Sequence, residues 1–369
     1  MATLPFDLVE EILCRLPVKS LKRFRAVAKT WGTLIDSENF IKKHLRQSLI
    51  TTSHRYLFLG GVQAYIVQLE ALDRAHSISP PYYERAVAGV SNSCNGIMLV
   101  QCDPPVLWNA FSREYRIFPN ILLDPDEVDG KDTYGFGYVS ESDDYKVVLV
   151  TESWCKETEE WVAYKANVYS LRSNSWPRIE KFPYPMPFSW ESWRVHVNGA
   201  LHTLLSNREE VNGVIMAFDL RSEDHFEIML PSGIKITGFH VKLIGLDGCL
   251  CVVCNSGDTV VKWVMKEYGV RESWVKLLTV SINEQISIVE PLTYSRDGAK
   301  LLLWCGYKRF YWCDMGSKTA EDIDVQGLDD WQDGFEHIQV CVESLVKLGH
   351  AVAEVSSTKN VVLILAHLH

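Results

Sequence analysis

The sequence contains few residues whose types and spacing suit catalysis or metal binding. It has no Gly-x-Ser-x-Gly nucleophile motif, no phosphate-binding P-loop and no His-Glu-x-x-His metalloprotease motif. His196 and His202 flank the Asn198-Gly199 pair and could face each other across a hairpin. No carboxylate or cysteine completes a ligand set there, and a metal needs three or four ligands. We therefore interpret both histidines as ordinary residues of a β-sheet.

Cysteines form one tight cluster, Cys249, Cys251 and Cys254, in which a metal would need a fourth ligand nearby. Cys249 and Cys251 would face the same side of a strand within an apolar run, which favours a place in the core. The sequence has ten cysteines and no Asn-x-Ser/Thr glycosylation site. Reduced thiols in the cytosol or nucleus are the simpler interpretation.

Two further segments match ligand sites only in part. Gly135-Phe136-Gly137 lacks the third glycine and the helical pattern of a dinucleotide site, so we expect a strand. The acidic run from Asp124 to Asp132 has a misplaced glycine and lacks the bidentate glutamate of a calcium loop, which favours a solvated loop. The sequence therefore predicts no metal site and no cofactor.

The composition is that of an ordinary globular protein, with 369 residues of which 47% are hydrophobic and 23% charged. The net charge is -10, although residues 1–50 carry nine Lys or Arg against five Asp or Glu. An acidic body without a long basic run argues against nucleic-acid binding. The sequence contains no run of about 18 apolar residues, so we expect no membrane span. Glu10, Glu11 and Arg15 interrupt any apolar core of a signal peptide.

The first 45 residues carry three helical patterns. The first follows Pro5 with Leu8, Val9, Ile12, Leu13 and Leu16 at helical spacing, and Pro17 ends it. The second fits residues 18–24, and the third fits residues 27–35, with Phe40, Ile41 and Leu45 following. This segment has more apolar side chains than so short a chain can bury by itself. It therefore needs a partner surface.

From about residue 55 onward the pattern changes to short β-type runs separated by turn pairs. The pairs Asn95-Gly96, Asp143-Asp144, Asn198-Gly199, Asp247-Gly248 and Asp297-Gly298 are 48, 55, 49 and 50 residues apart. After each pair come three β-type runs in the same order, which makes five similar units. A period near 50 is typical of a β-propeller built from four-stranded blades.

A sixth unit brings the two ends of the body together. Residues 55–60, 62–69 and 74–79 supply three strands and lack one before the first. The alternating run from His337 to Leu348 has no other partner, so we predict that it supplies the missing strand. Closing the ring in this way leaves no sheet edge exposed to aggregation.

The propeller topology sorts the connections onto two faces. The tight-turn face holds the turns between the first and second and between the third and fourth strands of each blade, and the long-connection face holds the others. Functional residues concentrate in loops, and aromatic and arginine residues anchor protein interfaces. The candidates for target binding on the long-connection face are Trp154, Trp161, Tyr184, Phe188, Trp190, Arg208, Arg309 and Trp331. Any one of the aromatics could instead fill a gap between blades.

The N-terminal segment resembles an F-box. The match rests on Leu4-Pro5, Leu8-Val9, Ile12-Leu13, Leu16-Pro17, Lys19-Ser20-Leu21, Phe24-Arg25, Val27, Lys29, Trp31, Leu34-Ile35, Phe40 and His44-Leu45. Ala28 stands where many plant members have cysteine, a small residue in place of another.

The body resembles the kelch-like, interaction-type F-box-associated domain of plants. The matching stretches are Ser93 to Gly96, Trp108-Asn109, Tyr134 to Tyr138, Asp143 to Val148, Val168 to Leu171, Ser175-Trp176, Phe218-Asp219, Trp263 to Met265 and Ser273-Trp274. Together the two resemblances span nearly the whole chain. They imply a mainly β protein with a three-helix F-box at residues 1–46, a propeller of about six blades at residues 51–349 and a tail at residues 350–369.

The resemblance implies a non-catalytic substrate receptor of a Skp/cullin/F-box ubiquitin ligase. The F-box would bind the Skp adaptor, and through it the cullin and RING subunits, while the propeller would hold an unidentified protein target for ubiquitination. The residues expected in the F-box core or at the adaptor are Leu4, Pro5, Leu8, Ile12, Leu13, Leu16, Pro17, Leu21, Val27 and Trp31. The sequence alone does not divide them between the two roles.

Two other functions compete with this interpretation. An F-box propeller could act outside a ligase as a protein-interaction scaffold, with adaptor binding and no cullin recruitment. A propeller enzyme or sugar-binding protein could use the central channel, since one fold hosts many functions. The sequence offers no convergent catalytic set for this last possibility.

Overall fold

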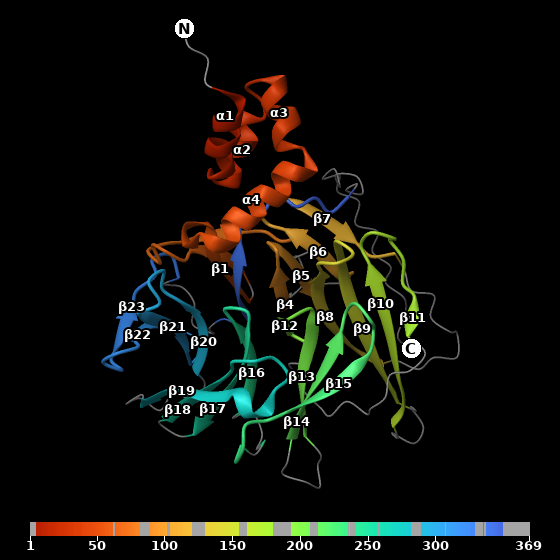
Figure 1. Cartoon of the computed structure of the whole chain (residues 1–369), viewed down its shortest axis with the longest axis vertical. Coiled ribbons are helices and arrows are strands. Elements are labelled where there is room, and N and C mark those ends of the chain that lie inside the picture. Colours follow the sequence, from red (N-terminus) through yellow and green to blue (C-terminus); the bar gives the residue numbers. More distant parts are fainter. Residues whose placement is uncertain are drawn as a thin grey trace, which may run out of the picture.

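Six four-stranded antiparallel sheets form a ring, and four helices stand at its edge in the computed structural model (Figure 1). The structure describes residues 5–61, 63–81, 89–101, 104–119, 130–154, 161–179, 193–206, 213–234, 236, 241–256, 259–281, 289–306, 308–328, 335 and 337–349. The fold is therefore mainly β, a six-bladed propeller behind an α-helical N-terminus, as the sequence predicts.

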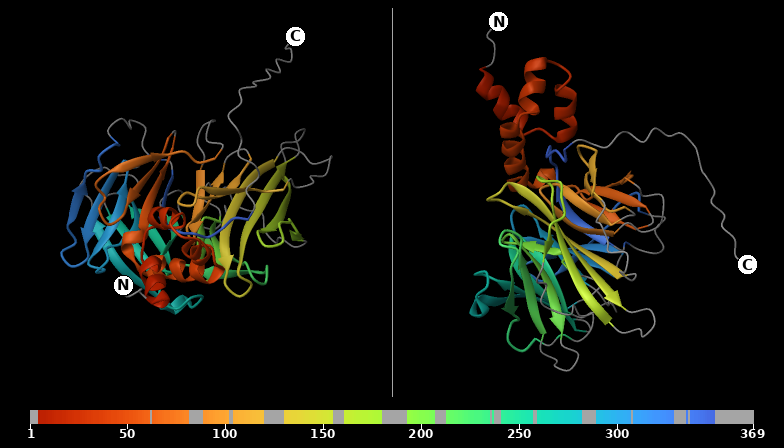
Figure 2. Two further views of the ribbon diagram at one scale, coloured as in Figure 1. Left: turned by 90° about the horizontal axis from the view of Figure 1, so that it is seen from above. Right: turned by 90° about the vertical axis from the view of Figure 1, so that its right-hand side faces the viewer.

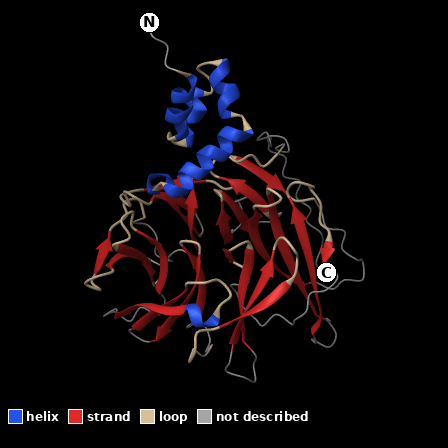
Figure 3. Cartoon of the chain, in the orientation of Figure 1, coloured by secondary structure: helices blue, strands red, loops and turns tan. Residues whose placement is uncertain are grey.

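The four α-helices gather in one unit at the N-terminus, whereas a 3-10 turn at Arg271–Ser273 lies in the propeller (Figure 3). They are α1 (Phe6–Cys14), α2 (Val18–Phe24), α3 (Lys29–Ile35) and α4 (Glu38–Ile50). The sequence predicted three helices, so α4 is an addition. Ser37 begins α4 as its N-cap, because the Ser37 hydroxyl accepts a hydrogen bond from the Phe40 N–H at 3.3 Å.

Each blade is one antiparallel sheet whose strands follow one another in the order of the chain, except in the blade that closes the ring. The strands are β1 (Arg55–Gly60), β2 (Ala64–Gln68), β3 (Ala75–Ile78), β4 (Gly89–Cys94), β5 (Ile97–Gln101), β6 (Val106–Asn109), β7 (Glu114–Ile117), β8 (Gly130–Val139), β9 (Asp144–Trp154), β10 (Trp161–Ser170), β11 (Arg178–Ile179), β12 (Val195–Val197), β13 (Ala200–Ser206), β14 (Gly213–Asp219), β15 (His225–Met229), β16 (Val241–Leu246), β17 (Cys249–Ser256), β18 (Thr259–Met265), β19 (Trp274–Ser281), β20 (Val289–Tyr294), β21 (Lys300–Cys305), β22 (Arg309–Asp314), β23 (Ala320–Ile323) and β24 (His337–Val342).

The ring closes where the two ends of the body pair. Strand β24 lies antiparallel to β1, from Arg55 opposite Val342 to Gly60 opposite His337. The blade order is β24-β1-β2-β3, which confirms the predicted closure. Residues 343–348, predicted as part of the same strand, continue beyond it without regular secondary structure. The first strands of neighbouring blades, β24, β4, β8, β12, β16 and β20, contact one another around the channel.

The hydrophobic core lies between the blades, so the middle strands are buried on both sides. In β1, Leu57 and Leu59 pack with Trp304 of one neighbouring blade. Phe58 points the other way and meets Trp108 edge-on, with ring centroids 6.3 Å apart. A continuous apolar run in a propeller strand therefore bridges two cores.

Three of the five predicted turn pairs, Asn95-Gly96, Asn198-Gly199 and Asp247-Gly248, have positive φ at both residues, whereas Asp143-Asp144 and Asp297-Gly298 have it at one residue only. Asn95 and Gly96 both have positive φ, 52° and 78°, which a tight two-residue hairpin requires. The helical unit lies on this tight-turn face, because Leu49 and Ile50 of α4 line a cavity together with the Asp247-Gly248 and Asp297-Gly298 turns. Figure 2 shows the helices beside the ring, on the side of these turns. The long connections begin and end on the opposite face.

The candidate metal residues of the sequence are structural. His196 pairs with Leu201 and His202 pairs with Val195, so the two histidines lie on opposite sides of their sheet. The prediction that they could face each other is therefore wrong.

The cysteine cluster is divided between two cores. Cys249 and Cys251 pack in one core between blades, and Cys254 packs against the next. Gly135-Phe136-Gly137 belongs to β8, as predicted, while Asp124 to Asp129 lie outside the described residues. No group of metal-binding side chains occurs among the residues that the structure describes, and none of the helices described is long and apolar enough to cross a membrane.

Buried histidines make the propeller sensitive to acid. Burial lowers the pKa of His196, His202 and His337 to about 4, from an ordinary value of 6.5. His202 is 1% exposed, and its ring nitrogens lie 3.1 Å from the Val195 carbonyl oxygen and 2.7 Å from the Tyr268 hydroxyl. Below pH 6.5 the histidines of the unfolded chain bind protons that those of the folded chain do not. The free energy of unfolding therefore decreases as the pH is lowered.

We expect His202→Gln to reduce this pH dependence. Glutamine does not titrate, so the slope of the free energy of unfolding between pH 6.5 and pH 4 should fall by up to about 1.4 kcal/mol per pH unit. Chemical denaturation at several pH values measures the slope. His76→Gln is the matched control, since His76 is exposed on β3. A slope unchanged in His202→Gln would contradict the assignment.

Candidate protein-interaction surfaces

The helical unit has a small core and an exposed apolar surface. Leu13 and Leu21, predicted as core or adaptor residues, are buried with Val18, Ile35 and Phe40. Leu16 and Trp31 are partly buried and pack against this core. These four residues therefore stabilise the unit from within.

The other predicted residues point outward. Leu8 is 52% exposed, Ile12 53% and Val27 66%, while Pro5 and Pro17 are also exposed. Leu8 and Ile12 are four residues apart in α1, so they lie on one face of the helix. Leu4 lies outside the described residues.

Phe6 belongs to the same exposed class. It begins α1, is 53% exposed and was missed by the sequence analysis. Its signal in the sequence is an aromatic residue next to the proline that precedes a helix. Large apolar groups exposed together on so small a unit mark an interaction surface.

The helical unit is anchored to the propeller by the segment that follows β24. Leu345 of this anchoring segment, residues 343–348, joins the core of the helical unit together with Phe111 of the turn between β6 and β7. The Asn109 side-chain amide, fully buried, donates hydrogen bonds to the carbonyls of Ser344 and Val346 at 3.0 and 3.1 Å. The anchoring segment is thus held from both sides.

A buried carboxylate joins the two parts. Glu343, 4% exposed, accepts a hydrogen bond from the Val18 N–H at the start of α2, 3.0 Å away. Its other oxygen accepts one from the Tyr56 hydroxyl of β1 at 3.1 Å. Burial raises the pKa of Glu343, and these two donors and His54 act in the opposite direction. Side-chain ion pairs Lys42–Asp143 and Lys347–Asp36 surround the junction at its rim.

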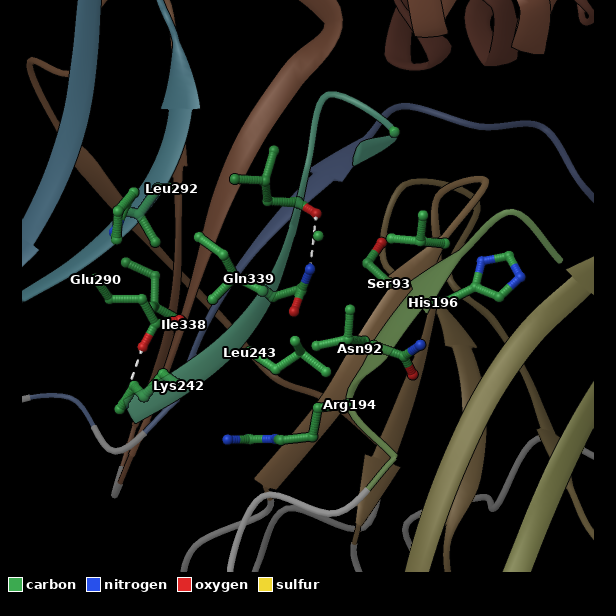
Figure 4. A pocket seen from close by; sticks show the side chains of 17 residues that line it. Asn92, Ser93, Arg194, His196, Lys242, Leu243, Glu290, Leu292, Ile338 and Gln339 are labelled. Atoms are coloured by element: carbon green, nitrogen blue, oxygen red, sulfur yellow. Dashed lines mark hydrogen bonds and ion pairs between the residues drawn. The ribbon is translucent and has the colours of Figure 1, made fainter. Parts of the chain in front are cut away.

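The channel through the ring is narrow and polar. Its cavity of about 230 Å³ is lined mainly by the first strands of five blades, β4, β12, β16, β20 and β24, and Figure 4 shows the side chains that line it. Lys242 of β16 and Glu290 of β20 form an ion pair at 3.3 Å. Arg194, just before β12, donates hydrogen bonds to the Val90 carbonyl at 3.1 Å and to His337 Nδ1 at 2.6 Å. All these residues lie where the first strands begin, which is the long-connection face.

The predicted target-binding residues are placed only in part. Trp154 ends β9 and Trp161 begins β10, where the two pair with each other. They lie in strands and not in the predicted loop, because the ladder between β9 and β10 continues through that polar stretch; their side chains are not described. Arg309 begins β22, with its guanidinium 3.8 Å from Asp322. Tyr184, Phe188, Trp190, Arg208 and Trp331 lie outside the described residues.

Comparison with known proteins decides the family. Residues 1–43 match the F-box domain, and residues 59–348 match the F-box associated beta propeller domain. This chain is a member of that F-box propeller family. The two matched ranges correspond to the two parts of the structure, the helical unit and the closed six-bladed ring.

The relatives come from Arabidopsis thaliana. The F-box protein CPR1 is 33% identical over 353 residues, covering 88% of this chain and 85% of the relative. The F-box protein At4g22390 is 30% identical, covering 88% and 87%. The F-box/kelch-repeat protein At3g23880 is 30% identical, covering 81% and 85%. The similarity thus includes both the F-box and the propeller.

We expect Glu343 to be required as a hydrogen-bond acceptor and not as a charge. Glu343→Gln keeps an acceptor and removes a buried charge. A carboxyl whose pKa is raised in the folded state loses stabilising free energy as the pH rises and the group ionises. The free energy of unfolding of the wild type should therefore decrease relative to that of Glu343→Gln between pH 5 and pH 8. Glu343→Ala should cost about 1–3 kcal/mol, since it leaves the Val18 and Tyr56 donors without an acceptor.

Chemical denaturation at both pH values checks this expectation. Glu321→Gln and Glu321→Ala are the controls, because Glu321 is exposed on β23 and pairs with Lys300 at the surface. In Glu343→Gln the amide oxygen can accept from the Val18 N–H, and the amide N–H₂ can donate to the Tyr56 hydroxyl oxygen. A Glu343→Gln variant as unstable as Glu343→Ala would contradict the expectation that the hydrogen bonds can be kept without the carboxylate.

Proposed function

We propose that this protein is the substrate-recognition subunit of a Skp/cullin/F-box ubiquitin ligase. The F-box would bind a Skp-type adaptor, which brings the cullin and RING subunits, and the propeller would bind a protein target. The single observation that carries the proposal is the exposed apolar surface of α1 on an F-box that is rigidly anchored to the ring.

The energetics favour a protein partner for this surface. Complete burial of one leucine or isoleucine side chain contributes roughly 1.5–3 kcal/mol. Leu8 and Ile12 are half exposed and adjacent on one helix face, so a partner that covers both gains a substantial part of its binding energy there. The buried residues beneath them, Leu13 and Leu21, hold that face in place.

The arrangement of the two faces supports a receptor role. The F-box stands on the tight-turn face, so it does not occupy the long-connection face, which we propose for the target (Figure 2). A receptor that holds target and adaptor in a fixed relation raises the local concentration of target lysines at the ligase. Catalysis would reside in the partner enzymes. The cytosol or nucleus is the proposed setting.

Adaptor binding by the full chain tests the proposal. Leu8→Ala with Ile12→Ala should weaken binding to a co-expressed Skp-type adaptor on the order of 100-fold, from about 1.5 kcal/mol for each side chain. Affinity chromatography followed by a binding titration measures the change. Met229→Ala with Val275→Ala is the matched control, because both residues are comparably exposed on the propeller. Undiminished adaptor binding by the α1 variant would refute the assignment of this surface.

Cullin recruitment separates a ligase subunit from a scaffold. The adaptor complex of the wild type should bind the cullin and support ubiquitination of a captured target. Adaptor binding without cullin recruitment would favour the alternative, an F-box propeller that acts as a protein-interaction scaffold outside a ligase.

A further inference from the structure

We propose that the mouth of the propeller channel on the long-connection face binds a single carboxylate side chain of the target, with Arg194 as its counter-charge. This inference rests on the proposed function, since it names the chemistry of the target. It depends on four groups at the start of the first strands, Arg194, Lys242, Glu290 and His337, of which the first three line the cavity.

The Arg194 side chain lies across the channel. Its backbone belongs to the blade that begins with β12, whereas its hydrogen-bond acceptors, Val90 and His337, belong to β4 and β24 farther round the ring. The guanidinium is therefore held in the opening by one of its nitrogens, Nη2. Its Nε and Nη1 donate to no group among the described residues, so N–H donors remain for a ligand.

The charges at the mouth do not cancel. Lys242 is paired with Glu290, which leaves that pair neutral overall. Burial and the neighbouring guanidinium lower the pKa of His337 to about 4, so His337 is uncharged at neutral pH. Arg194 has no carboxylate partner among the residues described. Among the described groups at the mouth, the Arg194 guanidinium is therefore a positive charge without a carboxylate partner, and a carboxylate from a ligand would pair with it.

The size of the cavity favours a side chain over a small-molecule ligand. Pockets for drug-sized molecules measure about 300–1,000 Å³, and this one measures about 230 Å³. An aspartate or glutamate side chain fits such a space, and a carboxylate pairs with the planar guanidinium through charge-assisted hydrogen bonds. The acidic surface of the body opposes such a target only weakly, because exposed charges beyond about 8 Å are screened at physiological salt.

Selection of peptides by the intact protein tests this inference. The full chain, co-expressed with a Skp-type adaptor, is immobilised and used to select from a displayed library of short random peptides. Selected peptides should share an aspartate or glutamate at one position. The corresponding asparagine or glutamine peptide should bind at least about tenfold more weakly, the usual effect of removing one partner of a desolvated charge pair.

A double-mutant cycle identifies the contact. Arg194→Gln should weaken binding of the acidic peptide by a similar factor, and the combination with the amide peptide should lose little more than either change alone. Arg221→Gln is the matched control, because Arg221 is an exposed arginine on the tight-turn face that lies near Glu141. Thermal unfolding of Arg194→Gln confirms that the ring remains folded, and Arg194→Lys provides a second variant that retains the charge.

Three outcomes would overturn the inference. They are peptides selected without a shared acid, acidic peptides that bind Arg194→Gln as tightly as the wild type, and a phosphoserine peptide that binds more tightly than its aspartate and glutamate versions. Failure of the wild type to bind the adaptor would instead refute the proposed function. The peptide cycle is still readable in that case, since the peptides can be immobilised in place of the protein.

Discussion

The fold depends on the pairing of β24 with β1, because this one contact closes the ring and also fixes the F-box. Six residues of β24 complete the blade, and the chain then continues directly into the anchoring segment, residues 343–348. Glu343 is the first residue beyond the strand, and it accepts hydrogen bonds from both the ring and α2. Loss of the closing strand would therefore open a sheet edge and release the F-box together.

This coupling assigns different tasks to the two faces. The tight-turn face carries the F-box, and its hairpins are defined by residues with positive φ such as Asn95 and Gly96. Among the described residues, the anchoring contacts of the F-box all lie on the tight-turn side, at Val18, Tyr56, Asn109 and the segment 343–348. This separation of the junction from the opposite face is the usual division between a scaffold and recognition loops.

The sequence predicted those parts of the protein that local chemistry determines. Turn pairs and β-type runs predicted six blades, and the alternation of residues 337–348 predicted the closing strand. Helix α4 was missed because Phe40, Ile41 and Leu45 were interpreted as an extension of the third helical pattern, and Leu49 and Ile50 were not considered with them. Trp154 and Trp161 lie in strands because pairing between β9 and β10 overrides a polar stretch. The division of the F-box residues into buried Leu13 and exposed Leu8 depends on packing, which a pattern does not contain. Arg194 and Glu343 have no local signal at all, since their partners lie more than a hundred residues away.

Glu343 and Arg194 are both ionisable groups with hydrogen bonds that span distant parts of the chain, but they differ in how completely those bonds use the group. Each carboxylate oxygen of Glu343 has a donor from the protein, so the group is satisfied and its role is to join two parts of the chain. The Arg194 guanidinium uses one nitrogen and leaves donors directed at an open channel. N–H donors of a partly buried charge that the protein leaves unused can be completed by a ligand. The first arrangement is that of a structural junction, and the second is that of a binding site.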